Sequence, residues 1–234
     1  MRSRVVWVVL LCVVLVVGVG LGAEALRFKD IKALSPSEFA ALVRISSAEG
    51  QKPVVGGTPE EVLVNALTGI TKLLWTNIRL LSEPAIRRMM GQREIDCAKL
   101  LMVYTAAIAV LENAEIEHRF LRGNPAKIQV TLTAPQVATT TMFAVVFLGA
   151  GSGVPEPDLE QIVLQDVEKF TDMVFRLFSS KSPLLRTEER LSLTILVEGS
   201  DGLLQTKQPL MAICQDFVSV IMDAMERGLR KYRR

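Results

Sequence analysis

The spacing of the hydrophobic residues changes once along this 234-residue chain, and the change restricts the fold more than any other feature. Before residue 122 the apolar residues recur mainly at the spacing of amphipathic helices. After the turn at Gly123–Pro125, apolar and polar residues alternate through Lys127–Pro135, which is the period of a half-buried strand. Helices gathered in the first half and strands mixed with helices in the second predict an α+β fold.

The first half is expected to form a long helical hairpin. Residues 58–61 read Thr-Pro-Glu-Glu, a capping box with proline in the first turn, so a helix begins there. Gly91 separates it from a second helix over about 92–121, whose centre is an uninterrupted apolar run. A short docking helix that starts at Ser35 and a linker over 46–57 precede the hairpin.

The second half is expected to form a β-β-α-β-α unit in which helices cover a small sheet. The alternating strand is followed by a β-branched and aromatic run over 139–149, which we interpret as a central strand. An amphipathic helix is predicted over 158–179, a strand over 190–199 and a closing helix over 209–227.

The start of the chain resembles an export signal in its composition. Met-Arg-Ser-Arg precedes residues 5–22, which carry no charge, and residues 23–25 read Ala-Glu-Ala, the small-x-small pattern of a signal peptidase site. Cleavage before Leu26 is therefore expected. The alternative is an uncleaved anchor formed by residues 5–22, because this run is near the minimum length for a membrane span. In both cases we expect an exported protein, periplasmic or extracellular.

These patterns divide the chain into three parts. We expect a signal peptide or signal-anchor at 1–25, a short helix and linker at 26–57, and a single α+β domain at 58–234. Within that domain, residues 58–122 are helical and residues 126–234 are mixed. Without the leader, 25 of the 27 basic and 24 of the 25 acidic residues remain, so the near-neutral balance gives no reason to expect a nucleic-acid partner.

The residue inventory excludes several catalytic chemistries. His118 is the only histidine, so zinc sites with two or three imidazoles are excluded, and a catalytic triad would have to use this residue. Glu115 and His118 have the spacing of a di-iron helix motif, but that site needs a second histidine. We interpret His118 as a surface residue near a helix end. No metal, cofactor or enzymatic activity is expected.

Three glycines at alternate positions from Gly149 to Gly153 resemble part of a phosphate-binding loop. The third glycine of a dinucleotide fingerprint belongs at position 154, which is valine, and no Gly-Lys-Ser/Thr sequence follows. Acidic residues also occupy the start of the next predicted helix, where they would repel an anion. We therefore expect a surface loop between a buried strand and a helix.

Two cysteines follow the leader, Cys97 and Cys214, each within an apolar helical pattern. In an oxidising compartment a disulfide between them is one interpretation. The other is a pair of separately buried thiols that behave as small apolar residues. Neither cysteine is expected to be a nucleophile, because each has an aspartate close in sequence, Asp96 and Asp216.

The chain ends in a basic cluster, for which two interpretations stay open. Cations at a helix C-terminus stabilise the helix dipole and need no further function. Alternatively, the cluster contacts anionic lipid headgroups or an acidic partner. Its members are Arg227, Arg230, Lys231, Arg233 and Arg234.

These observations favour a non-enzymatic envelope or secreted protein of the interaction class. It would dock on a protein partner, on a second copy of itself, or on a membrane surface through its long helices. The alternative is a binding protein for a small or apolar, lipid-like ligand in a cavity between sheet and helices. The side chains expected around that cavity are Met173, Phe175, Phe178, Met211, Met222 and Met225.

Overall fold

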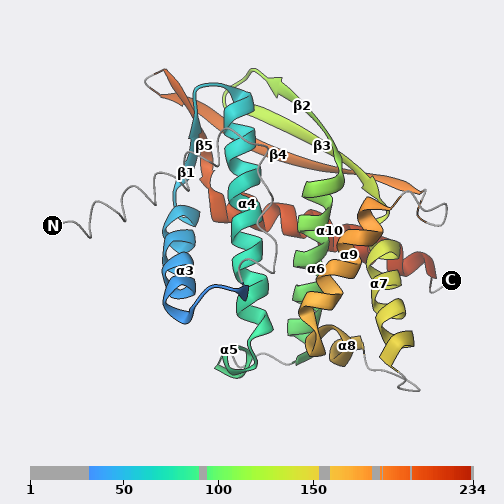
Figure 1. Cartoon of the computed structure of the whole chain (residues 1–234). Helices are drawn as coiled ribbons and strands as arrows, with labels where there is room; N and C mark the ends of the chain where they lie inside the picture. The colour runs from blue at the N-terminus through green and yellow to red at the C-terminus, as the bar shows by residue number, and fades with distance from the viewer. Residues whose placement is uncertain are drawn as a thin grey trace.

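The computed structural model describes residues 32–89, 94–152, 159–180, 185, 187–200 and 202–232. Within these residues, eight helices and a five-stranded antiparallel sheet form an α+β fold, so the predicted fold class is confirmed. The helices gather on one side of the sheet, and the C-terminal helix α10 (Leu210–Tyr232) crosses behind the others (Figure 1). The predicted leader at 1–25 lies outside the described residues.

The sheet has the strand order β1-β5-β4-β3-β2, and all neighbouring strands are antiparallel. Its centre is the long pair formed by β3 and β4, whose register runs without interruption from Ala126 opposite Val197 to Pro135 opposite Glu188. The strands are β1 (Pro53–Gly56), β2 (Glu115–Leu121), β3 (Ala126–Pro135), β4 (Glu188–Ser200) and β5 (Leu203–Pro209).

One face of the sheet is buried against helices and the other is polar. On β3 the side chains of Ile128, Val130 and Leu132 are fully buried, whereas Gln129, between them, is exposed. On β4 the alternation continues in the same way through Leu191, Leu193, Ile195 and Val197, which are all buried. This alternation is what the sequence pattern of both strands predicts, and it confirms the strands expected over 127–135 and 190–199.

Polar side chains cap the first turns of several helices in the helical layer. Ser35 forms a reciprocal capping box with Glu38, and the Thr58 hydroxyl accepts a hydrogen bond from the Glu61 N–H at 3.1 Å. Asp166 caps a later helix through Lys169 N–H. The helices are α3 (Pro36–Gly50), α4 (Pro59–Ser82), α5 (Pro84–Met89), α6 (Glu94–Asn113), α7 (Val137–Ser152), α8 (Leu159–Gln165), α9 (Val167–Ser179) and α10 (Leu210–Tyr232).

The core is one continuous cluster between this layer and the sheet. It reaches from Val54 on β1 to Met225 on α10, and its largest buried side chains include Trp75, Phe170 and Phe217. None of the helices in the described part of the chain is long and apolar enough to cross a membrane.

Two predicted elements have the wrong secondary structure. The helix expected to continue to residue 121 ends at Asn113, and Glu115–Leu121 is strand β2 instead. The run over 139–149, expected as a central strand, lies in helix α7. Its threonines fit a helix because Thr140 Oγ1 donates to the Gln136 carbonyl at 2.9 Å. Gly149 to Ser152 are therefore helical, not a loop, and residues 153–158 lie outside the description.

Three further differences are two strands that the sequence did not predict, β1 and β5, and a break within one predicted helix. The expected linker over 46–57 contains the end of α3 and all of strand β1, which pairs with β5. Strand β5 follows the turn at Gly202, where the backbone has a φ of +79° that glycine adopts easily. The helix predicted over 158–179 is interrupted at Asp166, which separates α8 from α9.

Candidate functional site

The most unusual surface of the described molecule is an exposed apolar face on α7. This helix buries Val137, Val145 and Leu148 in the core, yet Val146 and Phe147 are 57% and 52% exposed. Large exposed apolar side chains that are grouped together mark contact surfaces in soluble proteins. The sequence pattern did not reveal this face, because every position of the run is apolar or neutral.

The exposed face of α7 continues onto α10. A shallow pocket of about 230 Å³ lies between the two helices and is lined by Thr139, Met142, Phe143, Val146 and Leu229. The rings of Phe143 and Phe147 stack with their centroids 6.0 Å apart. We name this surface the α7 patch and define it by Met142, Phe143, Val146, Phe147 and Leu229.

A close approach of the two helices builds the α7 patch. A Cβ placed on Gly228 of α10 would lie 2.2 Å from the Cβ of Ala138 on α7, so only glycine fits without movement. This contact fixes Leu229, the next residue, beside α7.

The basic cluster predicted at the chain end belongs to the same end of α10 as Leu229. Arg227 and Arg230 are exposed on α10 to either side of Gly228 and Leu229. Arg230 also forms an ion pair with Glu226 at 3.1 Å, one helical turn earlier. Lys231 belongs to α10 by its backbone, and Arg233 and Arg234 lie outside the described residues. Two of the five predicted cations thus lie within one helical turn of Leu229 in α10, and such close sequence neighbours on a helix point in different directions.

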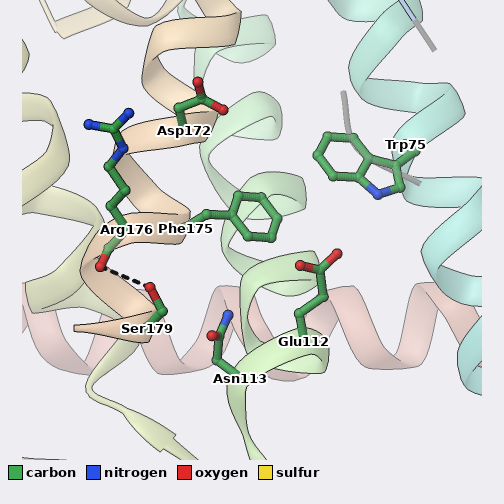
Figure 2. A pocket seen from close by; sticks show the side chains of 7 residues that line it. All are labelled: Trp75, Glu112, Asn113, Asp172, Phe175, Arg176 and Ser179. Atoms are coloured by element: carbon green, nitrogen blue, oxygen red, sulfur yellow. Dashed lines mark hydrogen bonds between the residues drawn. The ribbon is translucent and has the colours of Figure 1, made fainter. Parts of the chain in front are cut away.

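A second hollow of about 380 Å³ lies between α4, α6 and α9 and is shown in Figure 2. Asp172, Phe175, Arg176 and Ser179 line it from α9, and Glu112 and Asn113 from the end of α6. Its wall includes Phe175, which stacks on the indole of Trp75 with a centroid distance of 5.7 Å. Trp75 itself is 1% exposed, so Phe175 and the polar groups form the accessible surface. This chemistry suits a small polar molecule.

A third hollow is an apolar groove of about 570 Å³ between α3, α4 and α5. Phe39, Val43, Leu80 and Ile86 provide its apolar walls. At its rim the Arg79 guanidinium lies 5.6 Å from the centre of the Phe39 ring. Arg79 also forms an ion pair with Glu83 at 2.8 Å, so the groove can accommodate an apolar chain without calling for a charged end.

His118 is in a different environment from the one expected. It lies on strand β2, and its Nε2 is 3.5 Å from the Glu60 carboxylate at the start of α4. Residues three apart on a strand point to opposite faces, so Glu115 and His118 do not share a metal site. Among the described residues, no three His, Cys, Asp or Glu side chains gather in a metal-binding arrangement.

Both cysteines after the leader are buried thiols in the structure, Cys97 on α6 and Cys214 on α10. Burial raises the pKa of the Cys214 thiol to about 12, which disfavours the thiolate needed for nucleophilic attack. The disulfide between the two cysteines stays a prediction for oxidising conditions.

The side chains expected around a cavity between sheet and helices are dispersed. Phe178 and Met225 are buried in the core, Phe175 covers Trp75, and Met222 is 41% exposed.

No known protein family, curated protein or solved structure matches the chain.

Proposed function

We propose that the protein is an exported, non-enzymatic interaction protein that binds an anionic membrane surface through the α7 patch and the basic end of α10. The observation that carries this proposal is the exposure of Val146 and Phe147 near Leu229, on the end of α10 that also carries two exposed arginines. Apolar side chains that enter the acyl boundary and cations that remain at the headgroups are the two contributions to peripheral membrane binding.

Charge favours a lipid surface over an apolar protein partner. Residues 223–234 contain five basic and two acidic residues, so the end of the chain attracts an anionic surface. The predicted leader also supports this choice, because an exported or anchored chain passes through or remains at a membrane.

Flotation with vesicles tests the proposal on the chain from Leu26, the predicted mature form. The core described above extends only from Val54 to Met225, so this form retains it. We expect binding to vesicles rich in phosphatidylglycerol, weaker binding at high salt, and little binding to pure phosphatidylcholine.

Paired variants separate the two contributions. V146S/F147S removes apolar side chains and should lower binding about ten-fold or more. R227Q/R230Q removes two cations and should lower it by a similar factor while reducing the salt dependence. V64S is the matched control, because Val64 is 61% exposed on α4, away from the α7 patch. Equal binding of V146S/F147S and V64S would contradict the proposal.

A second candidate function is binding of a lipid-like ligand in the groove between α3, α4 and α5. The apolar walls favour an acyl chain, while the charge of Arg79 at the rim is already paired with Glu83 at 2.8 Å. Extraction of the purified protein followed by lipid mass spectrometry tests this. A fatty acid or acidic lipid at near-equal molar ratio that is lost in V43R supports it, whereas unchanged lipid content in V43R contradicts it.

A further inference from the structure

Strand β2 is an unprotected sheet edge. All seven of its residues, Glu115–Leu121, are exposed, and among the described residues it pairs with β3 on one side only. The backbone N–H and C=O groups along its other side are therefore available to another strand. Ile116 and Phe120, which are 38% and 36% exposed, add apolar surface to this edge.

The opposite edge of the sheet is protected in the usual way. Strand β1 has four residues, begins with Pro53 and has a register irregularity between Pro53 and Val55. Short length, proline and bulges are features that prevent edge-to-edge pairing. Strand β2 has none of them: it is longer, contains neither proline nor lysine, and keeps an unbroken register with β3.

We propose that two copies of the chain pair along β2, antiparallel, about a two-fold axis at His118. The two five-stranded sheets then continue into one sheet. A two-fold axis perpendicular to the sheet keeps the helix-covered face of both copies on the same side, so residues of one face meet residues of the same face. This interaction is independent of the membrane contact proposed above.

The sequence of β2 is self-complementary in this register. Glu117 of one copy lies opposite Arg119 of the other, and the symmetry repeats this pair of opposite charges. On the helix-covered face, Ile116 lies opposite Phe120, also twice. Opposite charges and apolar side chains that face each other are the pairs that stabilise neighbouring strands.

The neighbouring symmetric registers are unfavourable. An axis at Glu117 places the two Glu117 carboxylates opposite each other, and an axis at Arg119 does the same for the two guanidinium groups. Each of these registers also pairs fewer of the seven residues. An axis between two residues would place side chains of opposite faces against each other, which an antiparallel sheet does not allow.

The structure leaves room for the second copy on both faces of β2. Ile116, His118 and Phe120 share the face of Val130 on β3 and remain exposed, although the start of α4 reaches His118, whose Nε2 lies 3.5 Å from the Glu60 carboxylate. On the polar face, Glu117 and Arg119 lie opposite Thr131 and Gln129 of β3. The β3 residues that pair with these two charged side chains are therefore uncharged.

Cysteine cross-linking in the purified full chain, with Cys12→Ser as background, tests the register. In H118C the two new thiols face each other at a Cα separation of about 5 Å, which permits a disulfide on treatment with copper phenanthroline. In E115C the new thiols are about 20 Å apart, whereas E115C/L121C places each thiol opposite its partner. We expect at least ten-fold more disulfide-linked dimer in H118C and E115C/L121C than in E115C.

Charge exchange tests the same interface through the pairs of opposite charges between Glu117 and Arg119. In the H118C background, E117R and R119E each place like charges opposite each other and should lower the cross-linked fraction at least five-fold. The E117R/R119E double variant restores opposite charges and should restore the cross-link. Absence of a dimer in H118C, or equal cross-linking in all charge variants, overturns the proposal. If the purified H118C chain forms no dimer and, when oxidised in a cell extract, links at position 118 to a different chain, the proposal is overturned and the edge belongs to a foreign strand.

Discussion

At the scale of single residues, Cys214 shows how burial changes an ionisable group. It lies on α10 and is 4% exposed, and burial raises the pKa of its thiol from the usual 9.0 to about 12. Burial also raises the pKa of the nearby Tyr104 on α6, with a smaller contribution from Cys214 itself. The folded protein therefore retains protons that the unfolded chain releases in alkaline solution.

Alkaline pH is predicted to destabilise the protein. The folded pKa of Cys214 lies above the unfolded value, so its contribution to stability is fully present below about pH 9 and is lost as the pH approaches 12. Three pKa units correspond to a loss on the order of 4 kcal/mol in the free energy of unfolding. Urea denaturation at a series of pH values measures this loss.

The matched variant for this prediction is Cys214→Ala, which has no thiol to ionise. It should be less stable at neutral pH, because a small cavity replaces the sulfur, but its stability should fall less between pH 9 and 12. The remaining alkaline loss is expected from Tyr104. Parallel pH profiles for Cys214→Ala and the parent chain would be incompatible with this account.

At the scale of elements, secondary structure is predicted correctly where apolar and polar residues alternate clearly, and wrongly where the pattern has no contrast. Strands β3 and β4 have polar residues between most pairs of buried ones, with Leu196 between Ile195 and Val197 as an exception, so both faces of each strand could be identified from the sequence. Helix α7 has no such contrast: apolar or neutral residues occupy both its buried and its exposed side, so the period could not be determined. The α7 patch, which depends on this helix, could therefore not be found from the sequence.

Strand β2 was missed for a different reason. It follows helix α6 after Ala114, without a glycine or proline, so nothing in the sequence indicates where the helix ends. Its membership of the sheet is decided by pairing with β3, the strand that follows it after the turn over 122–125. The basic end of α10 was predicted because charge clusters are visible in sequence, but its position beside α7 was not.

The contact between α7 and α10 gives the prediction at this scale. Gly228→Ala places a methyl group against Ala138, so the helices must separate, and we expect a loss of about 1–3 kcal/mol in the free energy of unfolding. Gly199→Ala is the control, because the nearest atom to its added Cβ is 3.9 Å away. Chemical denaturation compares the two variants, and equal stability would show that the helices do not touch at Gly228.

At the scale of the whole molecule, one core connects both halves of the chain. Helix α4 from the first half packs on α6 and α10, and α3 packs on α4, while β1 completes the sheet formed by later strands. The change of hydrophobic period at residue 123 therefore does not divide the core into two parts. A chain connected in this way should unfold cooperatively.

Two probes in one variant test this cooperativity. Trp7→Phe leaves Trp75 as the only tryptophan, and Trp75 is buried in the helical layer against Phe175. Its fluorescence reports that layer, whereas far-ultraviolet circular dichroism reports all helices and strands. Because the core is continuous from Val54 to Met225, both signals should give the same urea midpoint.

Adding Phe175→Leu removes the stacked ring and should lower both midpoints equally. Separate midpoints would instead mean that the helical layer and the rest of the chain unfold as independent units, and the prediction of a single domain over 58–234 would then be wrong.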